Sequence, residues 1–389
     1  MKISQAPAER RTAVLVLADG TSAYGQGVGA AGEAVGEVCF NTAMTGYQEI
    51  LTDLSYAGQL ITFTCPHIGN VGANADDVES DSKSMAARGA IFRAFPTSPS
   101  NYRAQLDVSA WMRRRGIVGI AGVDTRALTA RIREKGMPHG VIAHNPAGQF
   151  DFDALLERAR SWAGLEGRDL AKSVTTLQPY VHAETGWSWD KGYGAHQGGG
   201  PHVVVIDYGV KMNILRRLSA EGCRVSVVAA SARYSDIMEM KPDGVVLSNG
   251  PGDPAATAEY AAPVIRELIE NKVPVFGVCL GHQLLAIAAG AKTRKMAQGH
   301  HGANHPVKDL STGKVEVVSM NHGFTVDAAA LPANVEETHV SLFDGSNCGI
   351  SLKDAPAFSV QHHPEASPGP EDSFYIFKRF IGRLQSSAA

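Results

Sequence analysis

The sequence predicts a two-domain α/β protein, in which a mixed β/α domain precedes an open, largely parallel sheet. Its 389 residues exceed the length of one typical domain. The segment 187–201, W-S-W-D-K-G-Y-G-A-H-Q-G-G-G-P, is rich in glycine and typical of a linker. After it, buried-type apolar runs alternate with helical stretches. We therefore predict a first domain over 1–186, a linker over 187–201 and a second domain over 202–389.

Short β-like runs, separated by glycine and polar turns, dominate the first domain. The predicted strands are Thr12–Leu17, Gly36–Phe40, Gln59–Thr64 and Gly116–Ala121. Two helices are predicted, Asp124–Lys135 and Phe152–Ala163, with Asp124 and Asp151 as N-caps. This pattern assigns no chemistry to the domain.

The second domain alternates between strands and helices, a succession that implies a parallel sheet covered on both faces. The predicted strands are Val203–Ile206, Arg224–Val228, Gly244–Ser248 and Pro274–Val278. The predicted helices are Met212–Glu221, Glu259–Asn271 and Leu280–Ala289. Ligands of such sheets bind beyond the carboxyl ends of the strands. The loops that follow the strands are therefore where chemistry is expected.

Composition excludes several classes of protein. An apolar content of 44%, a charged content of 19% and a net charge of -3 are typical of a globular protein without a nucleic-acid or membrane partner. The five cysteines are scattered and form no C-x-x-C pair, which argues against a disulfide framework and a structural zinc site. We expect a cytoplasmic protein.

A candidate nucleophile stands in V-P-V-F-G-V-C-L-G-H-Q, where Gly277 and Gly281 flank Cys279. A strand, a G-x-C-x-G turn and a helix form the cysteine counterpart of the nucleophile elbow. The helix N-terminus favours a thiolate and makes the N–H of Leu280 an oxyanion donor. The alternative, a buried free cysteine, is our interpretation of the other four, Cys39, Cys65, Cys223 and Cys348.

A candidate base follows the predicted strand Phe358–Gln361, in Q-H-H-P-E-A-S-P-G-P. In the H-P-E turn, the carboxylate of Glu365 can bond the imidazole of His363 and select its tautomer. His362 is the rival base. Neighbouring residues of a strand point to opposite faces, so only one imidazole should meet Cys279, and we favour His363. Taken alone, such a loop is more often polar surface than part of a catalytic site, and only its combination with the cysteine turn favours catalysis.

A third loop, S-N-G-P-G-D-P, follows the strand Gly244–Ser248. Its glycines expose backbone N–H groups that can cradle an anion or a carbonyl oxygen. Alone, such a loop is usually only a tight turn. We interpret it as part of a site because it is expected to lie beside the cysteine turn on the same sheet.

Together, N-G-P-G-D-P, G-V-C-L-G-H-Q and H-P-E-A-S-P-G-P resemble the class I, triad-type glutamine amidotransferases. The resemblance implies a flavodoxin-like sheet and hydrolysis of glutamine to glutamate and ammonia through a cysteinyl thioester. It implies Cys279 as nucleophile, His363 as base and Glu365 as the group that orients it. It further implies backbone donors to the oxyanion, Gly252 and Leu280, and glutamine-binding positions at Gly250, Gln283, Asn321, Gly323 and Phe324.

The remaining motifs resemble the small-subunit family of carbamoyl-phosphate synthases. They are F-N-T-A-M-T-G-Y-Q-E-I-L-T-D-L-S-Y-A-G-Q, P-H-I-G-N-V-G-A-N, G-V-D-T-R-A-L-T and D-Y-G-V-K-M-N-I-L-R-R-L. This resemblance adds Ser55 as a contact to glutamine. It implies a large partner subunit that uses two ATP, binds the ATP and Mg²⁺, and receives the ammonia to make carbamoyl phosphate for arginine and pyrimidine synthesis. This chain would bind no cofactor.

Other interpretations remain open on the residues alone. The chain could be the glutaminase subunit of an anthranilate, GMP or CTP synthase, a non-catalytic scaffold or regulatory subunit, or a free-standing cysteine hydrolase. The cluster of His300, His301 and His305 could suggest zinc. Because no cysteine or carboxylate accompanies these histidines at metal-ligand spacing, we expect no metal site.

Overall fold

The computed structural model describes residues 11–80 and 86–386, which form two compact units. The first unit runs to Glu166 and includes the segment Ala297–His301. The second unit contains Gly167–Met296 and continues from Gly302. The division at Glu166 precedes the predicted linker at 187–201, so the predicted domain boundary is wrong.

The reason for this error lies in strand pairing after Gly167. The strand β8 (Tyr180–His182) pairs antiparallel with β12 (Arg224–Ala229) and so joins the sheet of the second unit. The predicted linker holds the end of β9 (Glu184–Ser188) and all of β10 (Gly192–Ala195), which form an antiparallel hairpin. The glycine-rich composition therefore marks the turns of a hairpin.

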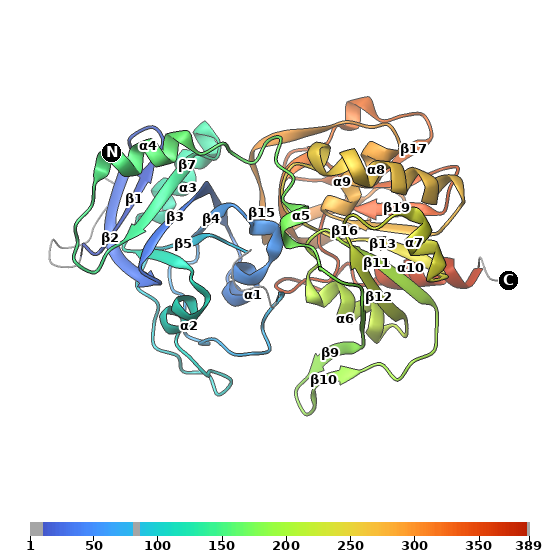
Figure 1. Ribbon diagram of the computed structural model, residues 1–389, viewed down its shortest axis with the longest axis horizontal. Coiled ribbons are helices and arrows are strands. Elements are labelled where there is room, and N and C mark those ends of the chain that lie inside the picture. The colour runs from blue at the N-terminus through green and yellow to red at the C-terminus, as the bar shows by residue number, and fades with distance from the viewer. Residues whose placement is uncertain (1–10, 81–85, 387–389) are drawn as a thin grey trace. The chain divides into compact units, whose positions relative to one another are not determined.

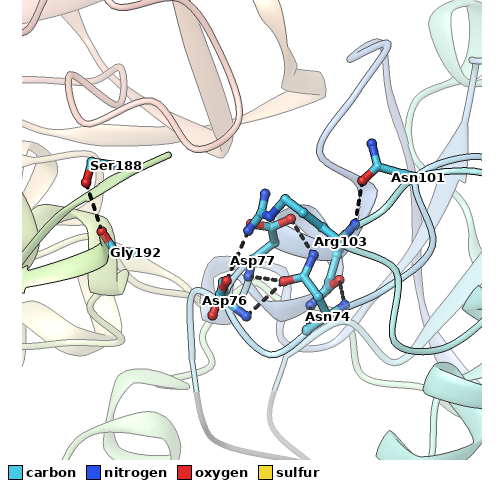
Figure 2. A network of polar contacts seen from close by, with 8 residues as sticks. Asn74, Asp76, Asp77, Asn101, Arg103, Ser188 and Gly192 are labelled. Carbon is cyan, nitrogen blue, oxygen red and sulfur yellow. Dashed lines mark hydrogen bonds and ion pairs between the residues drawn. The ribbon is translucent and has the colours of Figure 1, made fainter. Parts of the chain in front are cut away.

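Arg216 of the second unit contacts both strands of this hairpin. Arg216 donates to the carboxylate of Glu184 at 2.6 Å, and its guanidinium lies 3.9 Å from the ring centroid of Tyr193. Within the hairpin, Ser188 Oγ donates to the carbonyl of Gly192, as drawn in Figure 2. A cation–π contact together with an ion pair explains why this segment lies against the unit.

The first unit is a closed barrel, whose order among the described strands is β1-β2-β6-β5-β4-β3-β7. The strands are β1 (Ala13–Leu17), β2 (Ser22–Gly29), β3 (Gly32–Asn41), β4 (Gln59–Phe63), β5 (Gly89–Phe92), β6 (Val118–Ala121) and β7 (His139–His144). Closure and the strands β2, β5 and β7 were not predicted. The strand β2 was missed because its sequence, S-A-Y-G-Q-G-V-G, contains glycines, which are uncommon in strands. Glycine is needed at position 25, since a Cβ there would lie 2.2 Å from the carbonyl oxygen of Ala121. The mixed β/α class is confirmed.

The first unit also contains helices (Figure 1). They are α1 (Tyr47–Thr52), the 3₁₀ turn η2 (Leu54–Tyr56), α2 (Val108–Arg115), α3 (Thr125–Lys135) and α4 (Phe152–Ser161). Both predicted N-caps are confirmed. The carboxylate of Asp124 accepts from the N–H of Ala127 at 3.1 Å, and that of Asp151 from the N–H of Ala154 at 3.0 Å.

A polar network orders the loop that follows β4 (Figure 2). The side-chain oxygen of Asn74 accepts from the N–H groups of Asp76 and Asp77 at 2.8 and 2.9 Å. Arg103 donates to Asp77 at 2.8 Å and to Asp76 at 3.3 Å. Gln48 of α1 bonds both backbone groups of Asn74, so the loop also braces α1.

The second unit is built on a ten-stranded sheet, counted over the described residues, in the order β16-β15-β17-β18-β19-β14-β13-β11-β12-β8. The strands not yet bounded are β11 (His202–Asp207), β13 (Gly244–Leu247), β14 (Val275–Val278), β15 (Thr293–Asp309), β16 (Val315–Val326), β17 (Val335–Ser341), β18 (Asn347–Leu352) and β19 (Ala357–Val360). The strands from β12 to β19 in the centre are parallel, in the flavodoxin-like order 2-1-3-4-5, which confirms the predicted class. Toward the two ends of the sheet, β8 pairs antiparallel with β12, and β18, β17 and β15 pair antiparallel in succession beyond β19.

Helices cover both faces of this sheet (Figure 1). The bounds are α5 (Ala171–Val174), α6 (Met212–Ala220), α7 (Tyr234–Glu239), α8 (Pro254–Glu270), α9 (Leu280–Ala288), the 3₁₀ turn η3 (Ala328–Ala330) and α10 (Tyr375–Ser386). Apolar residues of α8 and α9 form one core and those of α6 and α10 the other. The helix α8 begins before the predicted Glu259, because Asp253 caps it and Pro254 suits its first turn.

The described helices include none that is both long and apolar enough to cross a membrane. What matters for the site is the sheet edge where β13, β14 and β19 end. These three strands are parallel neighbours, so their carboxyl ends meet at one edge. The three loops singled out in the sequence follow these strands and are brought together there.

The aromatic cluster beneath this edge sets a test of the fold. Phe276 of β14 is fully buried, with its ring centroid 5.0 Å from that of Phe358 and 5.8 Å from that of Phe377. We expect Phe276→Ala to lower the free energy of unfolding by about 3–5 kcal/mol, measured by urea denaturation followed by circular dichroism. Leu177→Ala is the control, since Leu177 is 97% exposed. Equal effects of both substitutions would contradict this packing.

Candidate active site

The turn between β14 and α9 holds Cys279 in a strained conformation. Its φ of 54° and ψ of -103° lie in a region that residues with a side chain rarely adopt. Glycine is required on both sides. A Cβ at Gly281 would lie 2.1 Å from the carbonyl oxygen of Leu247, and one at Gly277 would lie 2.6 Å from that of Gly281. The turn is therefore a nucleophile elbow.

The first turn of α9 offers a backbone donor beside the sulfur. The N–H of Gly281 donates to Ser248 at 3.0 Å, and that of Gln283 to the carbonyl of Cys279 at 3.2 Å. Within the described residues, the N–H of Leu280 has no hydrogen-bond partner. A group that develops negative charge next to Cys279 can therefore accept from Leu280.

Cys279, His363 and Glu365 come together in the second unit. The thiol of Cys279 is 2% exposed and lies 3.5 Å from the carbonyl oxygen of Asn321. His363 donates through Nδ1 to Glu365 at 2.7 Å, so its Nε2 is the nitrogen left for the sulfur. Nε2 forms no well-aligned hydrogen bond within the described residues, yet Cys279 lies close enough to raise the pKa of the imidazole.

The charges around the imidazole are unusual for a buried site. Burial alone would lower the pKa of His363, but the charges of Glu365 and Cys279 outweigh it and raise the pKa to about 10. Burial would raise the pKa of Glu365, but the charges of Lys211 and then His363 lower it to about 2. At neutral pH the site therefore holds an imidazolium between a carboxylate and a sulfur, the arrangement that accompanies a thiolate nucleophile.

Lys211 is a member of this cluster that the sequence analysis missed. Its Nζ lies 2.9 Å from Glu365 Oε1 and donates to the carbonyl of Ala366 at 2.6 Å. The carboxylate of Glu365 is thus shared between a lysine and the imidazole. The only signal was its place in D-Y-G-V-K-M-N, which contributed to the family resemblance. Nothing in the spacing connects Lys211 with a residue so far along the chain.

The loop that carries Glu365 is itself strained. Ala366 and Ser367 both have positive φ, 56° and 58°, although neither is glycine. The bond from Lys211 to the carbonyl of Ala366 and one from Asn213 Nδ2 to that of Glu365 restrain the loop. Such strain persists where the surroundings hold it in place.

The strand β16 aligns the cysteine and the histidine. Its carbonyl at Ser319 accepts from the N–H of His363 at 2.9 Å, and its carbonyl at Asn321 faces the thiol of Cys279. Further along, the N–H of Val317 donates to Asp372 at 3.1 Å. Three alternate residues of one strand therefore connect to the loops after β14 and β19.

The rival base His362 lies elsewhere. It is fully buried, and its ring centroid is 5.7 Å from that of His339. Burial, followed by the neighbouring imidazoles His339 and His363, lowers its pKa. The side chains of His362 and His363 thus occupy different surroundings, in line with the alternation of a strand.

The N-G-P-G loop approaches neighbouring backbone closely. A Cβ at Gly250 would lie 2.1 Å from the carbonyl oxygen of Tyr208. Gly252 has a φ of 94°, and a Cβ there would lie 2.7 Å from the carbonyl oxygen of Arg168. Asn249 is fully buried and accepts from the N–H of Lys211 at 3.0 Å. This loop therefore supports Lys211 as well as exposing backbone groups.

The glutamine-binding positions expected from the resemblance divide between the two units. Gln283 of α9 donates to the carbonyl of Phe324, and Asn321, Gly323 and Phe324 all lie on β16 of the same unit. Ser55 belongs to the first unit, in η2, where its N–H donates to Asp53 at 2.9 Å. Its contact with glutamine stays a prediction.

The histidine cluster has no metal-binding arrangement within the described residues, where no group of three or more His, Cys, Asp or Glu is placed to hold a metal ion. His301 lies in the first unit, its ring centroid 5.8 Å from that of Tyr56. His305 lies in the second unit and packs edge-on against Phe343.

Comparison with known proteins adds two family matches. Residues 204–382 match the family model described as glutamine amidotransferase class-I. Residues 15–142 match that described as the carbamoyl-phosphate synthase small chain, CPSase domain.

Curated relatives agree over nearly the whole length. The chain is 64% identical to the carbamoyl phosphate synthase small chain of Caulobacter vibrioides, over 97% of both chains. It is 62% identical to the protein of the same name from Mesorhizobium japonicum, over 97% of this chain and 95% of the relative.

The pKa shifts predict how stability depends on pH. The folded pKa of His363, about 10, exceeds its ordinary 6.5, so its stabilisation is complete below pH 6.5 and is lost as pH rises toward 10. The folded pKa of Glu365, about 2, lies below its ordinary 4.5, so its stabilisation is complete above pH 4.5 and is lost as pH falls toward 2. The pair therefore stabilises most between pH 4.5 and 6.5.

We expect the difference in free energy of unfolding between wild type and His363→Asn to be largest in that window and to shrink on either side. Urea denaturation at a series of pH values measures it. His67→Asn, at an exposed position, is the control and should show no such profile. A difference that stays constant up to pH 10 would contradict the charged pair.

Proposed function

Because the chain belongs to the carbamoyl phosphate synthase small-chain family, we propose that it is the subunit that hydrolyses glutamine for that enzyme. The observation that carries this proposal is the sulfur of Cys279 on its strained turn beside the imidazole of His363. A cysteine nucleophile with an oriented histidine is the requirement of acyl transfer from an amide.

The first half-reaction would transfer the acyl group to the enzyme. His363 holds the proton of Cys279, and the thiolate attacks the side-chain amide carbon of glutamine. The resulting oxyanion accepts from the backbone N–H groups of Leu280 and Gly252. When the C–N bond breaks, His363 returns the proton to the nitrogen, and ammonia leaves. The product on the enzyme is a glutamyl thioester.

The second half-reaction would release glutamate. A water molecule attacks the thioester carbon, and His363 takes one of its protons. The same two N–H groups stabilise the second oxyanion. The C–S bond then breaks, the thiolate of Cys279 is regenerated beside the imidazolium, and glutamate leaves. The new carboxyl group releases its remaining proton to solvent, so glutamine and water give glutamate, ammonia and one proton.

Glu365 and Lys211 would act through the imidazole. The carboxylate holds Nδ1–H at 2.7 Å, which fixes the tautomer and supports the positive charge formed in both steps. Lys211 keeps this carboxylate ionised and in place at 2.9 Å. Gly250, Gln283, Asn321, Gly323, Phe324 and, from the first unit, Ser55 are proposed to hold glutamine.

The ammonia is proposed to pass to a large partner subunit, which binds ATP and Mg²⁺ and makes carbamoyl phosphate from bicarbonate. This chain contains no G-x-x-x-x-G-K-[ST] loop, which fits nucleotide binding on the partner. We place the complex in the cytoplasm and its product in arginine and pyrimidine synthesis.

The competing functions each lack support. A glutaminase subunit of another synthase would not account for the match of residues 15–142 to the small-chain family. A scaffold would not require a strained cysteine, an ionised glutamate and a histidine joined in one buried cluster. A free-standing hydrolase would leave the first unit without a role.

The decisive test compares two nitrogen sources in the complex with the large chain. We expect Cys279→Ser to lower glutamine-dependent carbamoyl phosphate formation at least about 1,000-fold and to leave synthesis from ammonium chloride within about twofold of wild type. Glutamate release and carbamoyl phosphate are measured in parallel.

Cys223→Ser is the matched control, because Cys223 is a fully buried free cysteine that precedes β12, at the amino edge of the parallel strands, whereas Cys279 lies at their carboxyl edge. It should leave both activities unchanged. Glutamate release by Cys279→Ser at the wild-type rate would overturn the proposed nucleophile.

A further inference from the structure

Gln361 has a place in the site that no motif assigned to it. We propose that Gln361 is a positioning residue, which together with the carbonyl of Phe324 engages both N–H groups of the Gln283 amide, so that only its oxygen is offered to the substrate. The proposal rests on the function proposed above. It also names the substrate group that this oxygen recognises, the α-ammonium of glutamine.

The orientation of the Gln283 amide follows from its partners. One of its terminal atoms lies 2.8 Å from the carbonyl oxygen of Phe324. A carbonyl oxygen can only accept, so this atom must be the nitrogen Nε2. The same nitrogen lies 2.9 Å from Oε1 of Gln361. Both N–H groups of the amide are therefore engaged.

The group of that amide that remains available is its oxygen. Gln283 Oε1 forms no hydrogen bond with the described residues, and it is not among their fully enclosed, unpartnered polar atoms. It is thus open to an incoming donor and cannot bind a carboxylate. Of the charged groups of an amino acid, only the α-ammonium donates hydrogen bonds.

Gln361 is well placed to impose this orientation. It follows β19, its backbone N–H donates to Cys348 at 2.9 Å, and its side chain is fully buried. Its own Nε2 has no partner within the described residues. A buried unpaired donor costs stability, so an apolar side chain would serve packing better. What the side chain of Gln361 supplies, and an apolar side chain would not, is the hydrogen bond to Gln283.

Substitution of Gln361 would weaken the binding of glutamine and leave the rate of the chemical step unchanged. With its second N–H unpaired, the amide of Gln283 is restrained by the Phe324 carbonyl alone and can turn about that single hydrogen bond, so its oxygen is no longer held toward the substrate. The α-ammonium would then lose its acceptor. The contacts of Cys279, His363 and Glu365 do not include Gln361, so the chemical step should continue once glutamine is bound.

The test is a double-mutant cycle in the complex with the large chain. We expect Gln361→Met to raise KM for glutamine about 10- to 100-fold and to leave kcat within about twofold. Gln283→Met should raise KM at least as much. The double substitution should equal Gln283→Met alone, because Gln361 acts only through Gln283.

A second measurement uses glutaramate, which is glutamine without its α-amino group. The inhibition constant of glutaramate against glutamine should be the same for wild type and Gln361→Met. Thermal unfolding midpoints check that each variant is folded, and Gln361→Ala replaces the methionine variant if that does not fold.

Three results would overturn the proposal: additive effects in the double variant, a fall in kcat at unchanged KM, or weaker glutaramate inhibition with Gln361→Met. Failure of the proposed function is distinguishable, because wild type itself would then release no glutamate from glutamine.

Discussion

The close approach of backbone at the turn after β14 is the constraint on which the site depends. Gly281 lies against the carbonyl of Leu247, and no side chain fits between them. This contact sets the start of α9 and forces Cys279 to a φ of 54°. The sulfur is thereby fixed at the carboxyl edge of the sheet, where the ends of the neighbouring strands supply the groups around it.

Charge is arranged in an order that a buried site tolerates. Lys211, Glu365 and His363 alternate in sign along one chain of contacts that leads to Cys279, so each of these charges has an opposite neighbour. Removing a member would leave an uncompensated charge away from water, which is costly. The same alternation keeps the imidazole protonated beside the sulfur. The charges that stabilise the buried cluster are therefore also those that surround the proposed nucleophile.

The strand β16 connects recognition with chemistry. It meets Cys279 through Asn321, His363 through Ser319 and Gln283 through Phe324. A shift of this strand along its axis would move all three contacts together. Among the described strands, it lies at the edge of the sheet order, beside β15.

The sequence alone determined the parallel sheet, the elbow and the three loops, because apolar periodicity and glycine spacing act over a few residues. It led to the family resemblance, and through it to Cys279, His363 and Glu365. It misplaced the domain boundary, since the pairing of β8 with β12 joins distant segments. Only the tertiary structure revealed the closed barrel, Lys211 and Gln361. Their roles come from hydrogen bonds and charges between side chains far apart along the chain, and no local pattern encodes such contacts.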